Sequence, residues 1–264
     1  MSISFNRLGS HGRLGNQMFQ YASLRGIASR NGYSFTIPDS DGNNEWADHQ
    51  LFKYFKLGSL ETNNIGHSQH RVLSERSFNF DHNLFHNCED NVDILGYLQS
   101  EKYFLHIEDI IRQDFTFHDY ISKEAQETLE AYSKEPLISL HIRRTDYVNK
   151  IYHNGGCSIE YYDRALSLLE NNIKVLIFTD DVKWVEDQNC FKKDRYIIHN
   201  PMSNATDMCM MTMCDYNVIA NSSFSWWGAW LGKQERVIAP KIWFGSGGPT
   251  QWSDIYCDGW EIVS

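Results

Sequence analysis

The sequence of 264 residues lacks features that define several large classes of protein. It has no stretch of about 18 apolar residues and no apolar N-terminal segment, so neither a membrane-spanning helix nor a secretion signal is expected. Its six cysteines form no C-x-x-C pair, which argues against a zinc site or a redox-active dithiol. Basic residues are outnumbered, 24 against 34 acidic ones, and this deficit argues against a nucleic-acid partner.

These absences predict free thiols and a cytoplasmic location, with peripheral association at the inner face of a membrane as an open alternative. A hydrophobic content of 42% is enough to build packed cores, and the length predicts one large domain or two modest ones. The net charge of −10 still allows a small anionic ligand, because a local arginine cluster can act inside an acidic protein. No pattern indicates an oligomeric state.

Apolar segments of strand and helix type alternate along the chain. This alternation predicts an α/β fold with parallel sheets and right-handed crossovers. Near the start, a strand at 3–8, a glycine-containing loop, a helix N-capped by Asn16 and a strand at 33–37 form one such unit. Residues 39–125 show less pattern, with a strand at 92–98, a helix from about Ser100 and a helix at 123–132. The second half predicts strands at 137–143, 174–179, 195–199, 216–220 and 236–239, with helices between them.

The most informative segment is LISLHIRRTDYV at residues 137–148. Its apolar first half predicts a buried parallel strand, whose carboxyl end is where ligands bind in open α/β sheets. Arg143 and Arg144 follow directly. Guanidinium groups match phosphate geometry and keep their charge, so this pair is a candidate clamp for a diphosphate. The alternative is a pair of surface arginines held by Asp146 and other acids.

Three predicted strand ends converge on one edge of this sheet, at 141–146, 179–181 and 221–225. Ser222, Ser223 and the N-terminus of the following helix offer hydroxyl and backbone donors to the same phosphates, although plain helix capping explains the two serines equally well. Asp207 can accept two hydrogen bonds from a guanine edge, and helix capping is again the alternative.

Four motifs, in this order and spacing, make the sequence resemble the α-1,2-fucosyltransferases of glycosyltransferase family 11. They are GRLGNQMFQYA (12–22), HIRRTDY (141–147), FTDD (178–181) and ANSSFSWWGAWL (220–231). A more distant resemblance extends to the α-1,6- and protein O-fucosyltransferases. The family implies a GT-B architecture of two Rossmann-like domains facing a cleft, here residues 1–133 on the acceptor side and 134–264 for GDP-fucose. Thr145 departs from the family, which usually has glycine there.

The resemblance also implies roles for individual residues. Arg143 is expected at the β-phosphate, with Arg144 supporting the loop or the phosphate. His141 is expected at the guanosine, and Asp207 is expected to read guanine. Two further groups complete the expected donor site: Ser222, Ser223 and Phe224 along the pyrophosphate, and Gly15, Asn16 and Gln17 facing the cleft from the N-terminal domain.

The implied reaction is transfer of L-fucose from GDP-fucose to the 2-hydroxyl of a terminal β-galactoside, with inversion and no required metal or cofactor. Arg143 is the expected catalytic group, because the leaving diphosphate needs fixed positive charge. Asp146 is the nearest candidate base, and its alternative role is to orient an arginine. Two other hypotheses are a metal-dependent transferase using Asp39 and Asp41, and an inactive protein that only binds glycans or sugar nucleotides.

Overall fold

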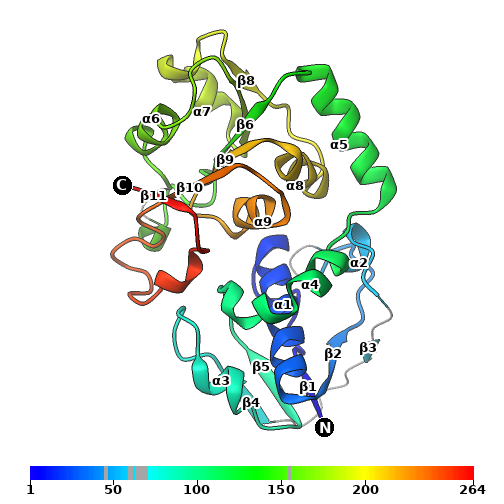
Figure 1. Cartoon of the computed structure of the whole chain (residues 1–264). Coiled ribbons are helices and arrows are strands. Elements are labelled where there is room, and N and C mark those ends of the chain that lie inside the picture. Colours follow the sequence, from blue (N-terminus) through cyan, green and yellow to red (C-terminus); the bar gives the residue numbers. More distant parts are fainter. Residues whose placement is uncertain (45–46, 59–61, 64–70, 154–155) are drawn as a thin grey trace. The chain divides into compact units, whose positions relative to one another are not determined.

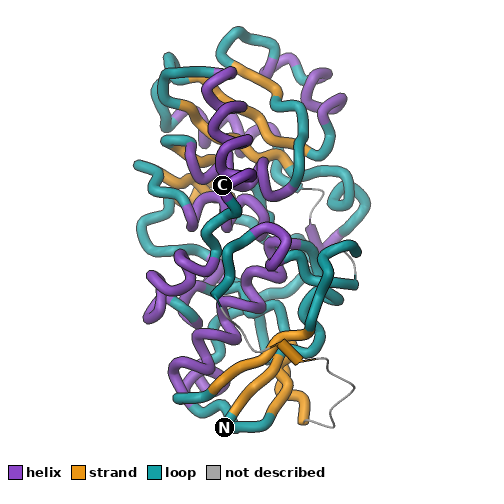
Figure 2. The backbone as a smooth tube through the Cα atoms, turned by 90° about the vertical axis from the view of Figure 1, so that its right-hand side faces the viewer, coloured by secondary structure: helices purple, strands orange, loops and turns teal. Residues whose placement is uncertain are grey.

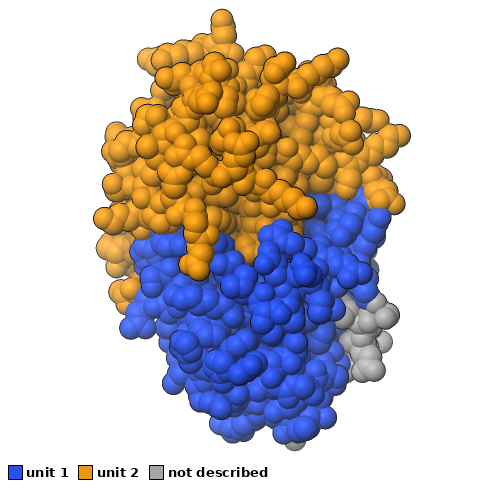
Figure 3. All heavy atoms as spheres, in the orientation of Figure 1, with its two compact units in different colours: residues 1–118, 251–257 blue, residues 119–250, 258–264 orange. Residues whose placement is uncertain are grey.

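The computed structural model describes residues 1–44, 47–58, 62–63, 71–153 and 156–264. Contacts divide the chain into two compact units (Figure 3). Unit 1 comprises Met1–His118 and Gln251–Cys257, and unit 2 comprises Asp119–Thr250 and Asp258–Ser264. The division expected after residue 133 put residues 119–132 in the first domain. Their helix instead belongs to unit 2, where it packs against the helix at Asn204–Met213.

Unit 1 is built on a five-stranded sheet of order β3-β2-β1-β5-β4, in which every pair is parallel. Its strands are β1 (Ser2–Ser4), β2 (Ser34–Pro38), β3 (Thr62–Asn63), β4 (Arg71–Ser74) and β5 (Val92–Leu95). Its helices are α1 (Leu14–Asn31), α2 (Leu51–Tyr54), α3 (His82–His86) and α4 (Glu108–Asp114), with 3-10 turns η1 (Glu101–Tyr103), η2 (Leu105–Ile107) and η5 (Ser253–Ile255).

Unit 2 carries a six-stranded parallel sheet of order β11-β10-β9-β6-β7-β8 (Figures 1 and 2). Its strands are β6 (Leu137–Ile142), β7 (Lys174–Thr179), β8 (Tyr196–Ile198), β9 (Tyr216–Val218), β10 (Arg236–Pro240) and β11 (Glu261–Val263). Its helices are α5 (Asp119–Tyr132), α6 (Ile159–Ser167), α7 (Val182–Asp187), α8 (Asn204–Met213) and α9 (Ser223–Leu231), with 3-10 turns η3 (Ile151–His153) and η4 (Asn189–Phe191).

The strand order of unit 2 reverses direction between β6 and β9. The chain runs outward from β6 to β7 and β8, returns to β9 on the other side of β6, and continues to β10 and β11. In such a sheet the crevice beyond the carboxyl ends of the two central strands is where ligands bind. The residues that follow β6 and β9 are therefore the first place to look for a site.

Several local predictions are wrong. Asn16 does not cap α1, because the helix begins at Leu14 with Arg13 as its N-cap. The Asn16 side-chain oxygen instead accepts a hydrogen bond from Gln99 Nε2 at 2.7 Å. The helix expected from Ser100 is two 3-10 turns before α4, although the Ser100 hydroxyl does cap the first of them. The short strands β3, β4 and β11 were not predicted.

All six cysteines are free thiols, as predicted. In the part of the chain that the structure describes, no helix combines the length and apolar character needed to cross a membrane.

Gly26 lies where α1 packs closely on η1, and its replacement by alanine tests this contact. A Cβ added at Gly26 would lie 2.0 Å from the backbone oxygen of Tyr103, which cannot move easily. An alanine inside a helix normally stabilises it by about 1 kcal/mol relative to glycine. Here we expect the opposite sign, a loss of about 1–3 kcal/mol from overpacking and a lower melting temperature for Gly26→Ala.

Gly58→Ala is the control, because a Cβ at Gly58 meets no atom of the described residues within 4 Å. Differential scanning fluorimetry on both variants checks this prediction. A Gly26→Ala protein as stable as the wild type would show that the two segments are not in close contact.

Candidate functional site

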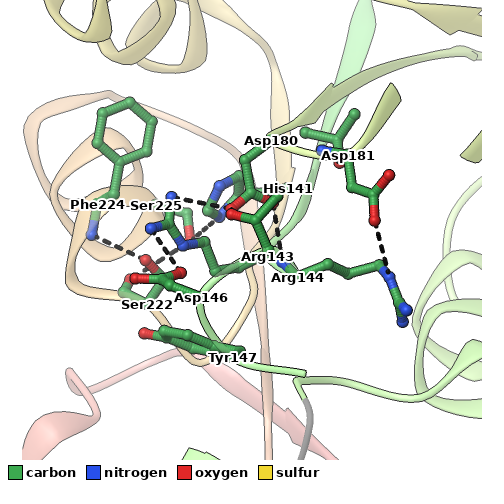
Figure 4. A network of polar contacts seen from close by, with 12 residues as sticks. His141, Arg143, Arg144, Asp146, Tyr147, Asp180, Asp181, Ser222, Phe224 and Ser225 are labelled. Atoms are coloured by element: carbon green, nitrogen blue, oxygen red, sulfur yellow. Dashed lines mark hydrogen bonds and ion pairs between the residues drawn. The ribbon is translucent and has the colours of Figure 1, made fainter. Parts of the chain in front are cut away.

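Arg143 lies directly beyond the carboxyl end of β6, a strand whose six residues are all buried. Its Nη2 atom is 2.7 Å from Asp146 Oδ1, and its Nη1 atom is 3.2 Å from Asp180 Oδ2 (Figure 4). The arginine side chain is only 17% exposed. One guanidinium is therefore fixed between two carboxylates, because a charge removed from water needs a partner.

Asp180 connects the Arg143 loop to the end of β7. It accepts hydrogen bonds from Arg144 N at 2.8 Å and from Thr145 Oγ1 at 2.5 Å, in addition to its ion pair with Arg143. Asp180 lies in the FTDD motif at 178–181, but the sequence predicted no role for it. The sequence does place Asp180 at the end of a predicted strand. It does not show that this strand pairs with β6.

Arg144 points away from Arg143 (Figure 4). Its guanidinium carbon lies 3.9 Å from the centre of the Trp184 ring, and its Nε atom is 3.5 Å from Asp181 Oδ2. Stacking on an aromatic ring and pairing with an acid fix this arginine against α7. Of the two roles expected for Arg144, this geometry supports anchoring of the loop.

His141 is the last polar side chain of β6 and is buried. Its Nδ1 atom is 2.8 Å from Ser225 Oγ, and its ring packs against Phe224 with centroids 5.6 Å apart. Burial, and then the nearby Arg143 charge, lower the pKa of His141 to about 3. The imidazole is therefore neutral at physiological pH. Its partner Ser225 was not a candidate from the sequence.

The N-terminus of α9 lies beyond the end of β9, beside this group. Ser222 is its N-cap, and the Ser222 hydroxyl accepts a hydrogen bond from Phe224 N at 3.3 Å. Ser223 is the first residue of the helix. Tyr147 donates its hydroxyl hydrogen to Asn221 O at 3.3 Å, which links the β6 loop to the β9 loop. Ser222 therefore caps α9. The role expected for Ser222 and Ser223 at a phosphate stays a prediction.

Asp207 belongs to the first turn of α8, whose N-cap is Ser203. Its Oδ1 atom accepts hydrogen bonds from His199 Nε2 at 2.9 Å and from Met202 N at 3.1 Å. Asp207 is therefore not the capping residue. Within the described residues its side chain makes no hydrogen bond to the Arg143 group, and guanine recognition stays a prediction.

The three expected residues of unit 1 lie in the first turn of α1. Gln17 is buried, and its side-chain oxygen accepts a hydrogen bond from Gln50 N at 2.9 Å. Asn16 is held by Gln99, which the sequence analysis did not identify. Gly15 is also buried. These contacts fix the turn, and a role in donor binding stays a prediction.

The motif around Asp39 and Asp41 forms a turn, because Asp41 Oδ1 accepts a hydrogen bond from Asn43 N at 2.9 Å. Over the described ranges, no three His, Cys, Asp or Glu side chains are grouped so that they could hold a metal ion.

The model of the glycosyl transferase family 11 matches residues 2–264. The chain belongs to glycosyltransferase family 11. It is 30% identical to the alpha-1,2-colitosyltransferase of Escherichia coli over 92% of this chain and 93% of the relative. It is 27% identical to galactoside alpha-(1,2)-fucosyltransferase 2 of Mus musculus, over 87% of this chain and 69% of the relative.

Two solved structures share the fold of this family 11 chain. The fucosyltransferase NodZ from Bradyrhizobium superimposes with a TM-score of 0.59 at 15% identity, covering 89% of this chain and 94% of NodZ. POFUT1 in complex with GDP gives 0.58 at 13% identity, covering 90% of this chain and 97% of POFUT1. Both have the GT-B fold, so the predicted fold class is confirmed.

His141 predicts a specific response of stability to acid. The unfolded chain takes up a proton at this residue near pH 6.5, whereas the buried ring does so only near pH 3. The stability contributed by the neutral ring is therefore present above pH 6.5 and is lost as the pH falls through this window. At pH 5 the loss is on the order of 2 kcal/mol.

Asparagine in His141→Asn keeps a polar partner for Ser225 but does not titrate. We therefore expect the melting temperature of this variant to fall less than that of the wild type between pH 7 and pH 5. His82→Asn, at an exposed position, is the control and should follow the wild type. Parallel melting curves for all three proteins would contradict the assigned burial of His141.

Proposed function

We propose that this family 11 enzyme transfers L-fucose from GDP-fucose to the 2-hydroxyl of a terminal β-galactoside, with inversion at the anomeric carbon. The observation that carries the proposal is the position of Arg143. A half-buried guanidinium, oriented by two carboxylates, stands at the strand-order reversal where a nucleotide diphosphate is expected to bind. The α-1,2 linkage is that of the two relatives, an alpha-1,2-colitosyltransferase and a galactoside alpha-(1,2)-fucosyltransferase.

In the proposed reaction Arg143 stabilises the charge that develops on the leaving diphosphate. A diphosphate leaves without protonation, so the site needs fixed positive charge and no general acid. The N-terminus of α9 adds backbone N–H groups and the positive end of a helix dipole. The neutral His141 ring adds a polar contact without competing charge.

Asp146 is better suited to orienting Arg143 than to deprotonating the acceptor. Its Oδ1 atom lies against the guanidinium at 2.7 Å, and this ion pair stabilises the carboxylate in its charged form. A paired carboxylate is a weak base. A loose, oxocarbenium-like transition state needs little help from a base, which fits this arrangement.

A second candidate donor is GDP-colitose, because the E. coli colitosyltransferase is similar to this chain along nearly the whole length of both proteins. Colitose is L-fucose without its 3-hydroxyl group. The two donors carry the same nucleotide, and the Arg143 site would serve both of them equally.

The decisive experiment supplies GDP-fucose and GDP-colitose separately, with lactose and other β-galactosides as acceptors. We expect a fucosylated product by mass spectrometry, with an α-1,2 linkage by NMR. Faster transfer from GDP-colitose would assign the enzyme to the second candidate. Binding of GDP without any product, across the acceptor panel, would favour a binding protein.

Arg143→Lys tests the charge clamp. Lysine keeps the charge but cannot reach both Asp146 and Asp180 in the fixed planar geometry of a guanidinium. Hydrogen bonds to charged groups are worth about 1.5–3 kcal/mol, so we expect kcat/KM to fall between tenfold and a few hundredfold.

Arg195→Lys is the matched control, because Arg195 lies at the opposite, amino end of the same sheet, where it donates to Ile173 O and Glu170 O. Its kcat/KM should stay close to the wild-type value. Near-wild-type kinetics for Arg143→Lys would remove the main support for the proposed mechanism.

A further inference from the structure

We propose that Tyr132 and His199 position Asp207 as the group that selects the nucleobase of the donor. This inference rests on the proposed function, because it concerns the guanine of a GDP-linked sugar. Neither Tyr132 nor His199 was a candidate from the sequence. Both are positioning residues, which act on the nucleotide only through Asp207.

The three side chains form one hydrogen-bonded row. His199 follows β8 and is 1% exposed. Its Nε2 atom is 2.9 Å from Asp207 Oδ1, and its Nδ1 atom is 3.1 Å from the Tyr132 hydroxyl. A carboxylate can only accept, so Nε2 carries the hydrogen. Nδ1 is within hydrogen-bond distance of the Tyr132 hydroxyl, so the orientation of the imidazole is fixed from both sides.

This row lies along the same edge of the sheet as His141. His141 and Phe178 are register partners on the neighbouring parallel strands β6 and β7, so their side chains lie on one face of the sheet. The Phe178 ring in turn packs against His199, with centroids 5.0 Å apart. The contacts therefore run from Asp207 through His199 and Phe178 to the strand position of His141.

Asp207 keeps acceptor capacity for a ligand. A carboxylate offers about four acceptor sites. His199 and Met202 N both bond to Oδ1, and Oδ2 receives no hydrogen bond from the residues that the structure describes. The side chain is 15% exposed, so a ligand can reach it. Guanine presents two N–H donors on one edge, N1–H and the 2-amino group, which match the two remaining sites.

Other bases match less well. Adenine presents an acceptor, N1, where guanine presents N1–H, and hypoxanthine has N1–H but lacks the 2-amino group. A correctly held Asp207 should therefore discriminate GDP from inosine diphosphate, which differ only in that amino group. Without the His199 N–H, Oδ1 loses a donor and the carboxylate can rotate, so both GDP affinity and this discrimination should fall.

The positioning role of these three side chains must be distinguished from a purely structural role, in which their hydrogen bonds only hold α5 and α8 together. A second hydrogen bond, from Thr206 Oγ1 to Glu124 Oε2 at 2.7 Å, links the same two helices. Thr206→Val removes this bond, keeps the volume of the side chain, and leaves His199 and Asp207 in contact. It is therefore the matched control for any loss of helix packing.

The experiment measures the dissociation constants of GDP and inosine diphosphate by calorimetry for each protein, together with kcat and KM for GDP-fucose. For the wild type we expect GDP to bind about tenfold more tightly, or more, since one hydrogen bond to a charged group is lost with inosine diphosphate. His199→Leu should bring this ratio close to one and raise KM about tenfold, while kcat changes little.

Two conservative variants keep the test informative if His199→Leu does not fold. His199→Gln places an amide N–H near the position of Nε2 and should recover most of the discrimination. Tyr132→Phe keeps the ring and should give an intermediate ratio. Thr206→Val should keep the wild-type ratio, whatever its melting temperature.

Asp207→Asn separates two claims: that Asp207 recognises guanine, and that Tyr132 and His199 position Asp207. If the wild type does not prefer GDP, or if Asp207→Asn keeps that preference, guanine recognition by Asp207 in the proposed function is wrong. If Asp207→Asn abolishes the preference while His199→Leu keeps it, Asp207 reads the base and the positioning role of Tyr132 and His199 is wrong.

Discussion

The site depends on a single positive charge that is held largely out of water. Arg143 needs partners because a guanidinium without them is costly at this depth, and Asp146 and Asp180 provide them from two different loops. Their ion pairs engage Nη2 and Nη1, and a guanidinium has five N–H donors. The arginine can therefore keep its orientation and still offer N–H donors to a ligand. The carboxylates fix the direction of the charge before any ligand arrives, which is what electrostatic stabilisation of a transition state requires.

The strand order brings this charge together with its neighbours. His141 and Ser225 are 84 positions apart in sequence and 2.8 Å apart in space, because β6 and β9 are adjacent at the centre of the sheet. Asp180 reaches Arg143 because β7 pairs with β6 on the other side. A sheet that grew in one direction from β6 would separate one of these partners from the arginine. The topology and the chemistry of the site are thus a single constraint.

The same reasoning explains what the sequence could and could not predict. Buried strands such as β6 and β7 carry continuous apolar runs, and the Ser158 cap of α6 is a local signal, so these elements were predicted correctly. Asparagine is a residue type that often caps helices, but the Asn16 side chain bonds to Gln99, 83 residues away. No local sequence pattern contains that information. The role of Asp180 depends on strand pairing in the same way. The strand β11 has three residues, which is too short for a periodic pattern, and it pairs with β10 at the edge of the sheet.

Thr145 shows how a departure from the family fits this constraint. The resemblance to the family leads one to expect glycine here, whereas the Thr145 hydroxyl donates a hydrogen bond to Asp180 Oδ2, the same oxygen that pairs with Arg143. Arg144 N donates to the other oxygen, so three consecutive residues contribute donors to one carboxylate. With glycine at 145 the backbone bond and the ion pair would persist, and only the hydroxyl bond would be lost. The threonine therefore strengthens the hold on Asp180 without replacing the Arg143 guanidinium. A difference at this position changes how firmly the arginine is held, while the charge that the chemistry requires stays the same.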